Sequence, residues 1–255
     1  INAAGQTVDL RAENGPLTQS GAGIIVARRL TGSADGGASL GAANRIDQLG
    51  DFAATGGGFF LNVDGALSIV GTVDSAAALR IQSGPMTIAS TGTIRSAGSG
   101  DAVILASNGV FTNDRDADAV QAANGRWLIY SQAAGNPGGS TSGNNFGGLG
   151  GRSYYGSAYD FGSGAFSGAP NAGNRFVYAY QPTLTVTPIN QRVTYNGQIP
   201  TLSALISGLI NGDLAGDAWS GAPLLSGATS RNAGTYGLSA SLGSLLSDLN
   251  YAFSF

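Results

Sequence analysis

Short apolar triplets recur along residues 38–112 at a nearly constant spacing. They form two series of aligned positions, Leu40, Leu61, Ile81 and Leu105 in the first and Ile24, Ile46, Ile69, Ile88 and Phe111 in the second. Each series advances by about twenty residues, a period typical of chains that coil and stack on themselves. Gly-rich corners separate the triplets, and the spacing within them is that of short strands rather than helices. The pattern predicts an all-β chain that begins with a right-handed parallel β-helix over residues 1–124.

A different pattern occupies residues 125–182. Gly125–Ser131 alternates apolar side chains between two faces and predicts a strand that is either a cap or the last strand of the coils, with Trp127 and Tyr130 as structural residues. A long Gly-, Ser- and Asn-rich loop without a period follows. Aromatic residues in such a loop either pack onto the coils, which we favour, or present a surface to a ligand or to a second copy. The candidates for that contact are Tyr154, Tyr155, Tyr159, Phe161 and Phe166.

From residue 183 to residue 255 the pattern predicts a small, mostly-β domain. Strands are expected at 184–187, 192–195, 202–206, 234–240 and 251–253, with a hairpin turn at Asn196–Gly197. Asp213 is expected to cap a single helical turn that reaches Trp219 and leaves Asp217 exposed. The aromatic residues expected to be structural here are Tyr195, Trp219, Tyr236 and Tyr251.

Composition narrows the function classes. Of 255 residues, 42 are Gly and only 11% are charged, which suits regular β-structure with tight corners. The sequence has no Cys and no His, which excludes disulfides and thiolate or imidazole metal ligands. All 12 basic residues are Arg and the net charge is −3, so we expect no nucleic-acid partner. No apolar run approaches the ~20 residues of a membrane span. No cofactor is predicted.

Three groups of side chains are candidates for chemistry, each with a simpler structural explanation. Asp114, Asp116 and Asp118 alternate as Ca²⁺ ligands can, although the spacing of a hand-type calcium loop is not met and a solvated turn is expected. Arg28 and Arg29 could grip an acidic glycan through their guanidinium groups, or lie in water. Arg45, Asp47 and Asp51 are the tight cluster within the coils for a carbohydrate-active enzyme, and solvent-facing corner positions, which we favour, explain them without chemistry.

The residues also resemble a known family. Residues 43–52, 65–69, 125–131, 146–149, 174–177 and 181–186 are similar to filamentous-haemagglutinin-type exoproteins of Gram-negative bacteria. From Val193 the chain resembles the MBG-type repeat of such surface proteins, in the elements 195–197, 207–209, 211–213, 232–236 and 250–253 and at Pro200. The terminal domain is therefore expected to be MBG-type, with a β-grasp- or Ig-like fold.

The resemblance implies a secreted or outer-membrane-surface adhesin with a role in adhesion, aggregation or biofilm. Its implied partners are the outer-membrane transporter of a two-partner (type V) secretion system and a host, abiotic or matrix surface or glycan. The amino-terminal secretion module of the family is absent, so we expect a piece of a longer protein. We predict no catalysis: the coils form a stiff rod that presents the loop and the terminal domain. Two alternatives stay open, a filament subunit assembled head-to-tail by strand addition and a β-helix polysaccharide lyase or hydrolase.

Overall fold

The computed structural model describes residues 1–21, 23–131, 144–169, 173–194, 196–227 and 230–255. It is nearly all β, with about 2% of residues in a helix. The chain divides into two compact units, Ile1–Ala179 and Tyr180–Phe255. Each unit is described by itself below.

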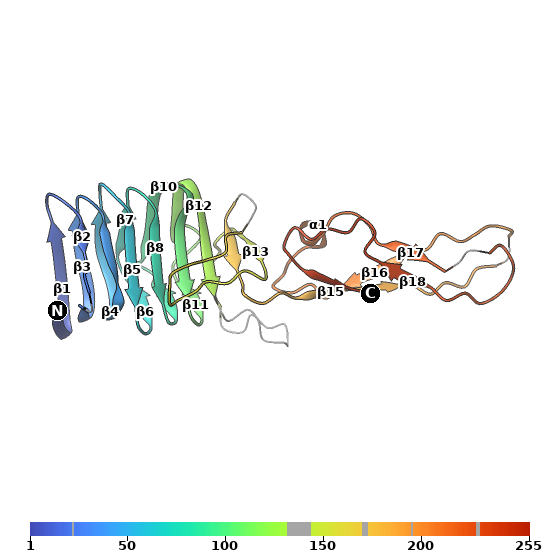
Figure 1. Cartoon of the computed structure of the whole chain (residues 1–255), viewed down its shortest axis with the longest axis horizontal. Helices are drawn as coiled ribbons and strands as arrows, with labels where there is room; N and C mark the ends of the chain where they lie inside the picture. Colours follow the sequence, from blue (N-terminus) through green and yellow to red (C-terminus); the bar gives the residue numbers. More distant parts are fainter. Residues whose placement is uncertain (22, 132–143, 170–172, 195, 228–229) are drawn as a thin grey trace. The chain divides into compact units, whose positions relative to one another are not determined.

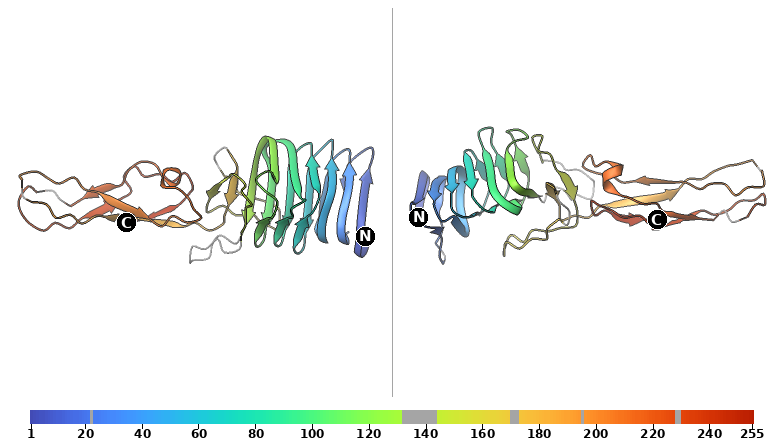
Figure 2. Two further views of the ribbon diagram at one scale, coloured as in Figure 1. Left: turned by 180° about the vertical axis from the view of Figure 1, so that it is seen from behind. Right: turned by 90° about the horizontal axis from the view of Figure 1, so that it is seen from above.

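The first unit is a β-solenoid of about seven turns. Its strands are β1 (Asn2–Ala12), β2 (Leu17–Thr18), β3 (Val26–Ala34), β4 (Ala38–Ala54), β5 (Phe59–Val63), β6 (Leu67–Ile69), β7 (Thr72–Ser75), β8 (Leu79–Ser83), β9 (Met86–Ile88), β10 (Thr93–Ser107), β11 (Phe111–Asn113), β12 (Val120–Ser131), β13 (Arg152–Tyr154) and β14 (Arg175–Val177). Figure 1 shows them succeeding one another from β1 to β12 along the solenoid, and Figure 2 shows the same succession from behind and from above.

Every pair of neighbouring strands in this unit is parallel, which is the pairing of stacked coils. The long strands turn corners, so that each contributes to more than one face. β4 pairs with β5 near its start, with β6 in its middle and with β7 at its end. β10 pairs likewise first with β7 and then with β8. These features confirm the predicted parallel β-helix.

The first apolar series lies in register along the β5 face. Leu40 pairs with Leu61, Leu61 with Ile81 and Ile81 with Leu105, and the ladder continues to Ile129 on β12. The side chains of this ladder are buried within the coils, where they share one apolar core. The predicted alignment of this series is therefore confirmed at each step.

The second series was mostly wrong in register. Ile69 does pair with Ile88. In the preceding coil, however, the residue that pairs with Ile69 is Leu49 and not Ile46. Ile46 and Leu49 are both apolar and both buried, so the pattern could not choose between them. At the other end Ile88 pairs with Asn113 rather than Phe111, because a buried polar residue occupies the core position there.

Parallel pairing continues past residue 124, where the coils were predicted to end. β12 pairs with β10 from Val120 to Ser131, so Gly125–Ser131 belongs to a coil and is not a separate cap. β14 then pairs with β12 on one side and with β13 on the other, so the later strand inserts between the two earlier ones. Trp127 and Phe176 pack at 5.0 Å between ring centroids, and Phe146 lies 3.9 Å from Phe176. These rings close this end of the core.

Close stacking explains the glycines at the corners. A Cβ on Gly56 would lie 1.9 Å from the carbonyl oxygen of Asp35 in the coil below, so no larger residue fits there. Gly37 has a φ of +93°, which is strained for a residue that carries a side chain. A Cβ on Gly37 would also lie only 2.8 Å from the carbonyl oxygen of Gly58. The corner glycines therefore set how closely successive coils approach.

The second unit contains β15 (Thr183–Pro188), β16 (Ala204–Ser207), α1 (Ala215–Ala218), β17 (Leu224–Ser226), β18 (Ser239–Ser241) and β19 (Ala252–Ser254). β15 lies between β16, which is antiparallel to it, and β19, which is parallel. β17 and β18 form a two-stranded antiparallel sheet. Leu184 and Val186 are the buried side chains of β15, and Leu245, Leu249 and Tyr251 complete the apolar interior.

Several local predictions for this unit need correction. No strand forms over the described part of 192–195, and the segment predicted at 234–240 forms a strand only at 239–241. The predicted helical turn exists as α1, but Leu214 is its N-cap and makes no side-chain bond. Asp213 instead accepts a hydrogen bond from the Tyr251 hydroxyl at 2.7 Å, a tertiary contact that outcompetes the local cap. Asp217 is half-buried.

Within the described residues, no helix is long and apolar enough to cross a membrane.

Asn44 is the buried polar residue on which the third coil depends. It is fully buried at an irregularity in the pairing of β4 with β5. Its amide nitrogen donates to the carbonyl oxygens of Leu40, Ala42 and Asn62, and its side-chain oxygen accepts from the Ile25 amide at 2.8 Å and from Gln19 at 2.7 Å. One side chain thus satisfies backbone groups of three successive coils.

We therefore predict that Asn44→Ala lowers the free energy of unfolding of the first unit by about 3 kcal/mol, because several buried groups lose their partner at once. Urea unfolding followed by circular dichroism measures the loss. Asn124→Ala is the matched control, since Asn124 is exposed and donates one bond, to Ala97. Equal losses in the two variants would contradict the role of Asn44.

Candidate functional site

The outer face of the last coils carries a second apolar core, covered by residues 157–169, which we call the strap. Its buried members are Ile104, Ala106, Leu128, Tyr130, Tyr159, Ala169 and Val177. Leu128 and Tyr130 point to this outer face while Trp127 and Ile129 line the inner core, as the alternation of the strand predicts. The strap forms because outward-facing positions on β10 and β12 are apolar and need cover.

Polar side chains of the coils hold the strap by its carbonyl groups. Gln82 donates to the Phe161 carbonyl at 3.0 Å, and Arg80 donates to that of Gly164 at 3.0 Å. The Tyr130 hydroxyl donates to the Ser167 carbonyl at 2.7 Å, and Arg126 to that of Ala169 at 2.6 Å. The donors come from β8 and β12, so the strap is fastened on both sides of β10, which lies between them.

Arg80 also lies between two aromatic rings. Its guanidinium carbon is 5.9 Å from the centroid of Phe60 and 5.1 Å from that of Phe166. A guanidinium so placed is attracted by the electron-rich ring faces. Arg80 thereby ties Phe166 of the strap to β8, whereas Tyr130, whose ring is 5.9 Å from that of Phe166, lies on β12.

The two tyrosines of this core are held in their neutral form. Burial raises the pKa of the Tyr130 hydroxyl, and the nearby Asp101 carboxylate raises it further. Burial also raises the pKa of the Tyr159 hydroxyl. The nearby Arg80 guanidinium lowers this pKa, but the pKa stays above its ordinary value. Tyr159 donates to the Gln82 side-chain oxygen at 2.6 Å, a bond that only the protonated phenol can make.

A tight turn at Asp160 shapes the tip of the strap. The carboxylate accepts hydrogen bonds from the Ser163 hydroxyl at 2.5 Å and from the Gly162 amide at 2.9 Å. These bonds, that of Ser163 first, lower the pKa of Asp160. The turn brings Phe161 and Phe166 to the same side of the strap, against Tyr159.

The five aromatic contact candidates all pack within the chain. Tyr155 is fully buried and stacks on Tyr178 at 5.4 Å, and Tyr159 is 8% exposed. Tyr154, Phe161 and Phe166 are half-buried against the outer core. A ligand contact by Tyr155 or Tyr159 would require the strap to move, whereas the other three keep some surface.

The two arginines proposed to grip a glycan have different surroundings. Arg29 is half-buried and its Nε donates to the Gln48 side chain on the next coil at 3.0 Å. Arg28 is exposed on β3. In this pair, therefore, the Arg29 guanidinium is already hydrogen-bonded within the chain and the Arg28 guanidinium is exposed to solvent.

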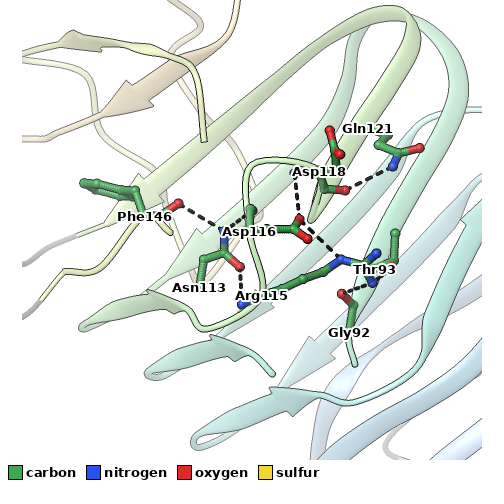
Figure 3. Close-up of polar contacts among 8 residues, drawn as sticks. All are labelled: Gly92, Thr93, Asn113, Arg115, Asp116, Asp118, Gln121 and Phe146. Carbon is green, nitrogen blue, oxygen red and sulfur yellow. Dashed lines mark hydrogen bonds and ion pairs between the residues drawn. The ribbon is translucent and has the colours of Figure 1, made fainter. Parts of the chain in front are cut away.

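The three aspartates proposed as calcium ligands lie on a turn that Arg115 and Asn113 organise, and Figure 3 draws two of them, Asp116 and Asp118, with their partners. Asp116 faces Arg115, with 3.4 Å between its Oδ1 and the arginine Nε, and the same oxygen accepts from the Asp118 amide. Arg115 in turn reaches the Gly92 carbonyl and the Thr93 hydroxyl in the coil below. Within the described residues, Asp114, Asp116 and Asp118 do not gather into a group able to hold a metal ion, and neither does any other set of acidic residues.

The proposed structural aromatics are placed as follows. Trp127, Tyr130 and Tyr251 are buried, and the Tyr251 hydroxyl accepts from the Ile210 amide at 3.1 Å. Trp219 is half-buried at the end of α1, and Tyr236 is half-buried with its hydroxyl on the Asn232 carbonyl at 2.9 Å. Tyr195 lies outside the described residues.

The acidic cluster considered for an enzyme is spread over the outer surface. Asp51 accepts from the Thr72 amide at 2.8 Å and so serves the corner of the next coil. Arg45 is 3.9 Å from Asp64 rather than paired with Asp47, which is exposed. The arrangement matches a set of corner residues.

One concave feature was not expected from the sequence. A groove of about 390 Å³ opens on the outside of β4, β7, β10 and β12, and Asp74, Arg95 and Gln121 line it. Each of these follows a buried apolar residue by one position, Val73, Ile94 and Val120. Their alignment depends on the pairing register, so the spacing of single polar residues along the chain could not reveal it.

Comparison with known families matched residues 184–255 to the MBG domain (YGX type). The terminal sheet region is therefore MBG-like, as its motifs predicted. The search among curated proteins and the search among solved structures each returned no match for the chain.

We predict that the first unit loses stability at alkaline pH through Tyr130 and Tyr159. Their pKa values in the folded chain lie above the ordinary 10.0, so the unfolded chain ionises first as pH rises. The stability that they contribute is complete below about pH 10 and is lost progressively above it. Urea midpoints measured between about pH 9 and pH 12 should therefore fall.

The Tyr130→Phe/Tyr159→Phe double variant is the control for this prediction. It loses two hydrogen bonds and should start less stable, but its urea midpoint should fall less steeply with pH. Identical slopes in the two proteins would show that other groups cause the alkaline loss.

Proposed function

We propose that the chain is a non-catalytic extracellular protein with a structural and adhesive role. The observation that carries the proposal is the succession of a β-solenoid of about seven turns and a region that matches an MBG domain. A solenoid is a repetitive scaffold whose outer faces offer extended surface rather than an enclosed pocket. Such a scaffold suits contacts to large partners such as a cell surface, a glycan or a matrix.

The finer proposal is a filamentous-haemagglutinin-like exoprotein, exported by a two-partner system through an outer-membrane transporter of a Gram-negative bacterium and acting in adhesion or biofilm. Support comes from the coil and MBG-type motifs of the sequence. The low charge and the absence of Cys also fit a chain that crosses membranes before it folds. The alternative of a polysaccharide lyase or hydrolase is not favoured, because its candidate residues do not gather into one site: Asp51 binds the Thr72 amide at a corner and Arg45 faces Asp64.

Adhesion is the direct test of this proposal. Beads coated with the whole chain should attach to at least one of epithelial cells, polystyrene and polysaccharide-coated plates, and attachment should require the folded coils. Leu61→Asp is the matched control, because a charge in the fully buried first ladder should unfold the solenoid. Attachment to none of the three surfaces would reject the adhesive role. Release of reducing ends or unsaturated products from a polysaccharide panel would reject its non-catalytic part.

A specific observation keeps the filament alternative as a second candidate. β1 pairs with β3, and β19 pairs with β15, and within the described residues each has this one partner strand. A strand with one partner carries a row of unpaired backbone groups on its other edge, which a second copy can fill.

If copies add to these edges, the purified chain should form species larger than 25.4 kDa whose share grows with concentration. Analytical ultracentrifugation measures this growth, and electron micrographs decide whether the assemblies are linear. A strictly monomeric chain at high concentration would eliminate the filament.

A further inference from the structure

The groove on the β7 face presents a row of polar side chains at the spacing of the coils. Ala53 pairs with Asp74, Asp74 with Arg95 and Arg95 with Gln121, so the four positions stand in line on β4, β7, β10 and β12. Adjacent strands are about 4.8 Å apart, so the row is on the order of 14 Å long. It offers an acceptor, a donor and an amide in succession along the solenoid.

A second row of mainly methyl groups runs beside the first. Two residues after each member of the first row are Thr55, Ala76, Ala97 and Ala123, which also line the groove. All four are exposed. The groove therefore has an apolar side that extends over four coils and a polar side that extends over three of them, from Asp74 on β7 to Gln121 on β12.

The polar row is available to a ligand because its ion pair is loose. Asp74 and Arg95 approach to 4.0 Å, and about half of each side chain is exposed, 50% and 49%. By contrast, Asp101 on β10 and Arg126 on β12 are 2.6 Å apart and only 28% and 17% exposed, and Arg126 is bound to the strap. Exposed pairs of the first kind gain little from each other, so ligand groups can bridge them at small cost.

We infer that this groove binds a neutral, hydroxyl-rich polysaccharide that runs along the solenoid. Hydroxyl groups both donate and accept, so a sugar chain can satisfy Asp74, Arg95 and Gln121 in turn. Gln121 uses its amide nitrogen on the Asp118 carbonyl, which leaves its side-chain oxygen for the ligand. The C–H faces of the sugars rest against the alanine methyls. The inference rests on the proposed adhesive function, since it names the class of ligand for that contact.

Other linear ligands fit this groove less well. The backbone groups of β7, β10 and β4 pair with one another, so an extended peptide would find side chains but no free strand edge for its own backbone. A polyanion would gain Arg95 but meet Asp74 in the adjacent position, in a chain of net charge −3.

No aromatic ring is among the residues that line the groove, so no sugar can stack on a ring there. Each coil then contributes only a few hydrogen bonds and methyl contacts, so a short sugar should bind weakly. A chain long enough to touch all four coils adds these contacts in one binding event. Affinity should therefore rise steeply with the number of sugars.

In the experiment, the whole chain is titrated with neutral glucose oligomers of three linkages, β-1,4, β-1,3 and α-1,6. Each linkage is tested as the disaccharide and as the hexasaccharide, and a polygalacturonate oligomer of matched length is the acidic comparison. Isothermal titration calorimetry should show at least one neutral hexasaccharide binding about tenfold or more tighter than its disaccharide. Asp74→Ala and Arg95→Ala should each weaken that binding about fivefold or more. Ala97→Leu, at an exposed position, should block the groove and abolish it.

Arg45→Ala is the matched control, since Arg45 forms a similarly loose and more exposed pair with Asp64, at 3.9 Å and away from the groove. It should bind as the unaltered chain does, and circular dichroism should show all variants folded. The inference is overturned if no neutral hexasaccharide binds, if the disaccharide binds equally well, if polygalacturonate binds tighter, or if Arg45→Ala weakens binding as much as Arg95→Ala. Bead attachment that persists in Arg95→Ala and Ala97→Leu would leave the adhesive function standing while this site fails.

Discussion

The parallel backbone pairing between coils is the constraint on which the rest of the first unit depends. Because each coil bonds to the one below in a fixed register, every side chain acquires a defined neighbour about 4.8 Å away. Apolar residues then stack inside, as Leu61 does on Leu40, and corners must contain residues small enough for the coils to approach, as Gly56 does. Packing, corner chemistry and outer surface all follow from this one repeat.

The end of the solenoid shows how the chain departs from that repeat. β14 inserts between β12 and β13, and the intervening segment returns as the strap over the outer face. The coils supply the apolar platform and the donors, while the strap supplies aromatic rings and carbonyl groups. A face that would otherwise expose Leu128 and Tyr130 becomes a second core, so the aromatic content of the loop serves packing.

Sequence reasoning predicted those features that depend on local pattern. The β-helix, the first apolar ladder and the two-faced strand around Trp127 were correct because period and alternation determine them. It failed where a position depends on distant partners: Asn113 occupies an apolar position because its amide serves the Asp116 and Phe146 carbonyls, and Asp213 leaves its helix for Tyr251. The groove could not be predicted from the sequence for the same reason, since Asp74 and Arg95 become neighbours only through the pairing register of β7 and β10.

Register also governs which charges a solenoid can carry. A residue repeated at one position of successive coils stacks on itself, so like charges would repel at short range along the whole ladder. This chain keeps charge low and joins opposite signs across coils, as in Arg45 with Asp64, Arg95 with Asp74 and Arg126 with Asp101. The outer faces are consequently polar but close to neutral, and they repeat along one axis. A linear, neutral partner with hydroxyl groups along its length can pair with a different polar side chain at each coil, Asp74, then Arg95, then Gln121, which is why we infer a sugar polymer rather than a compact ligand.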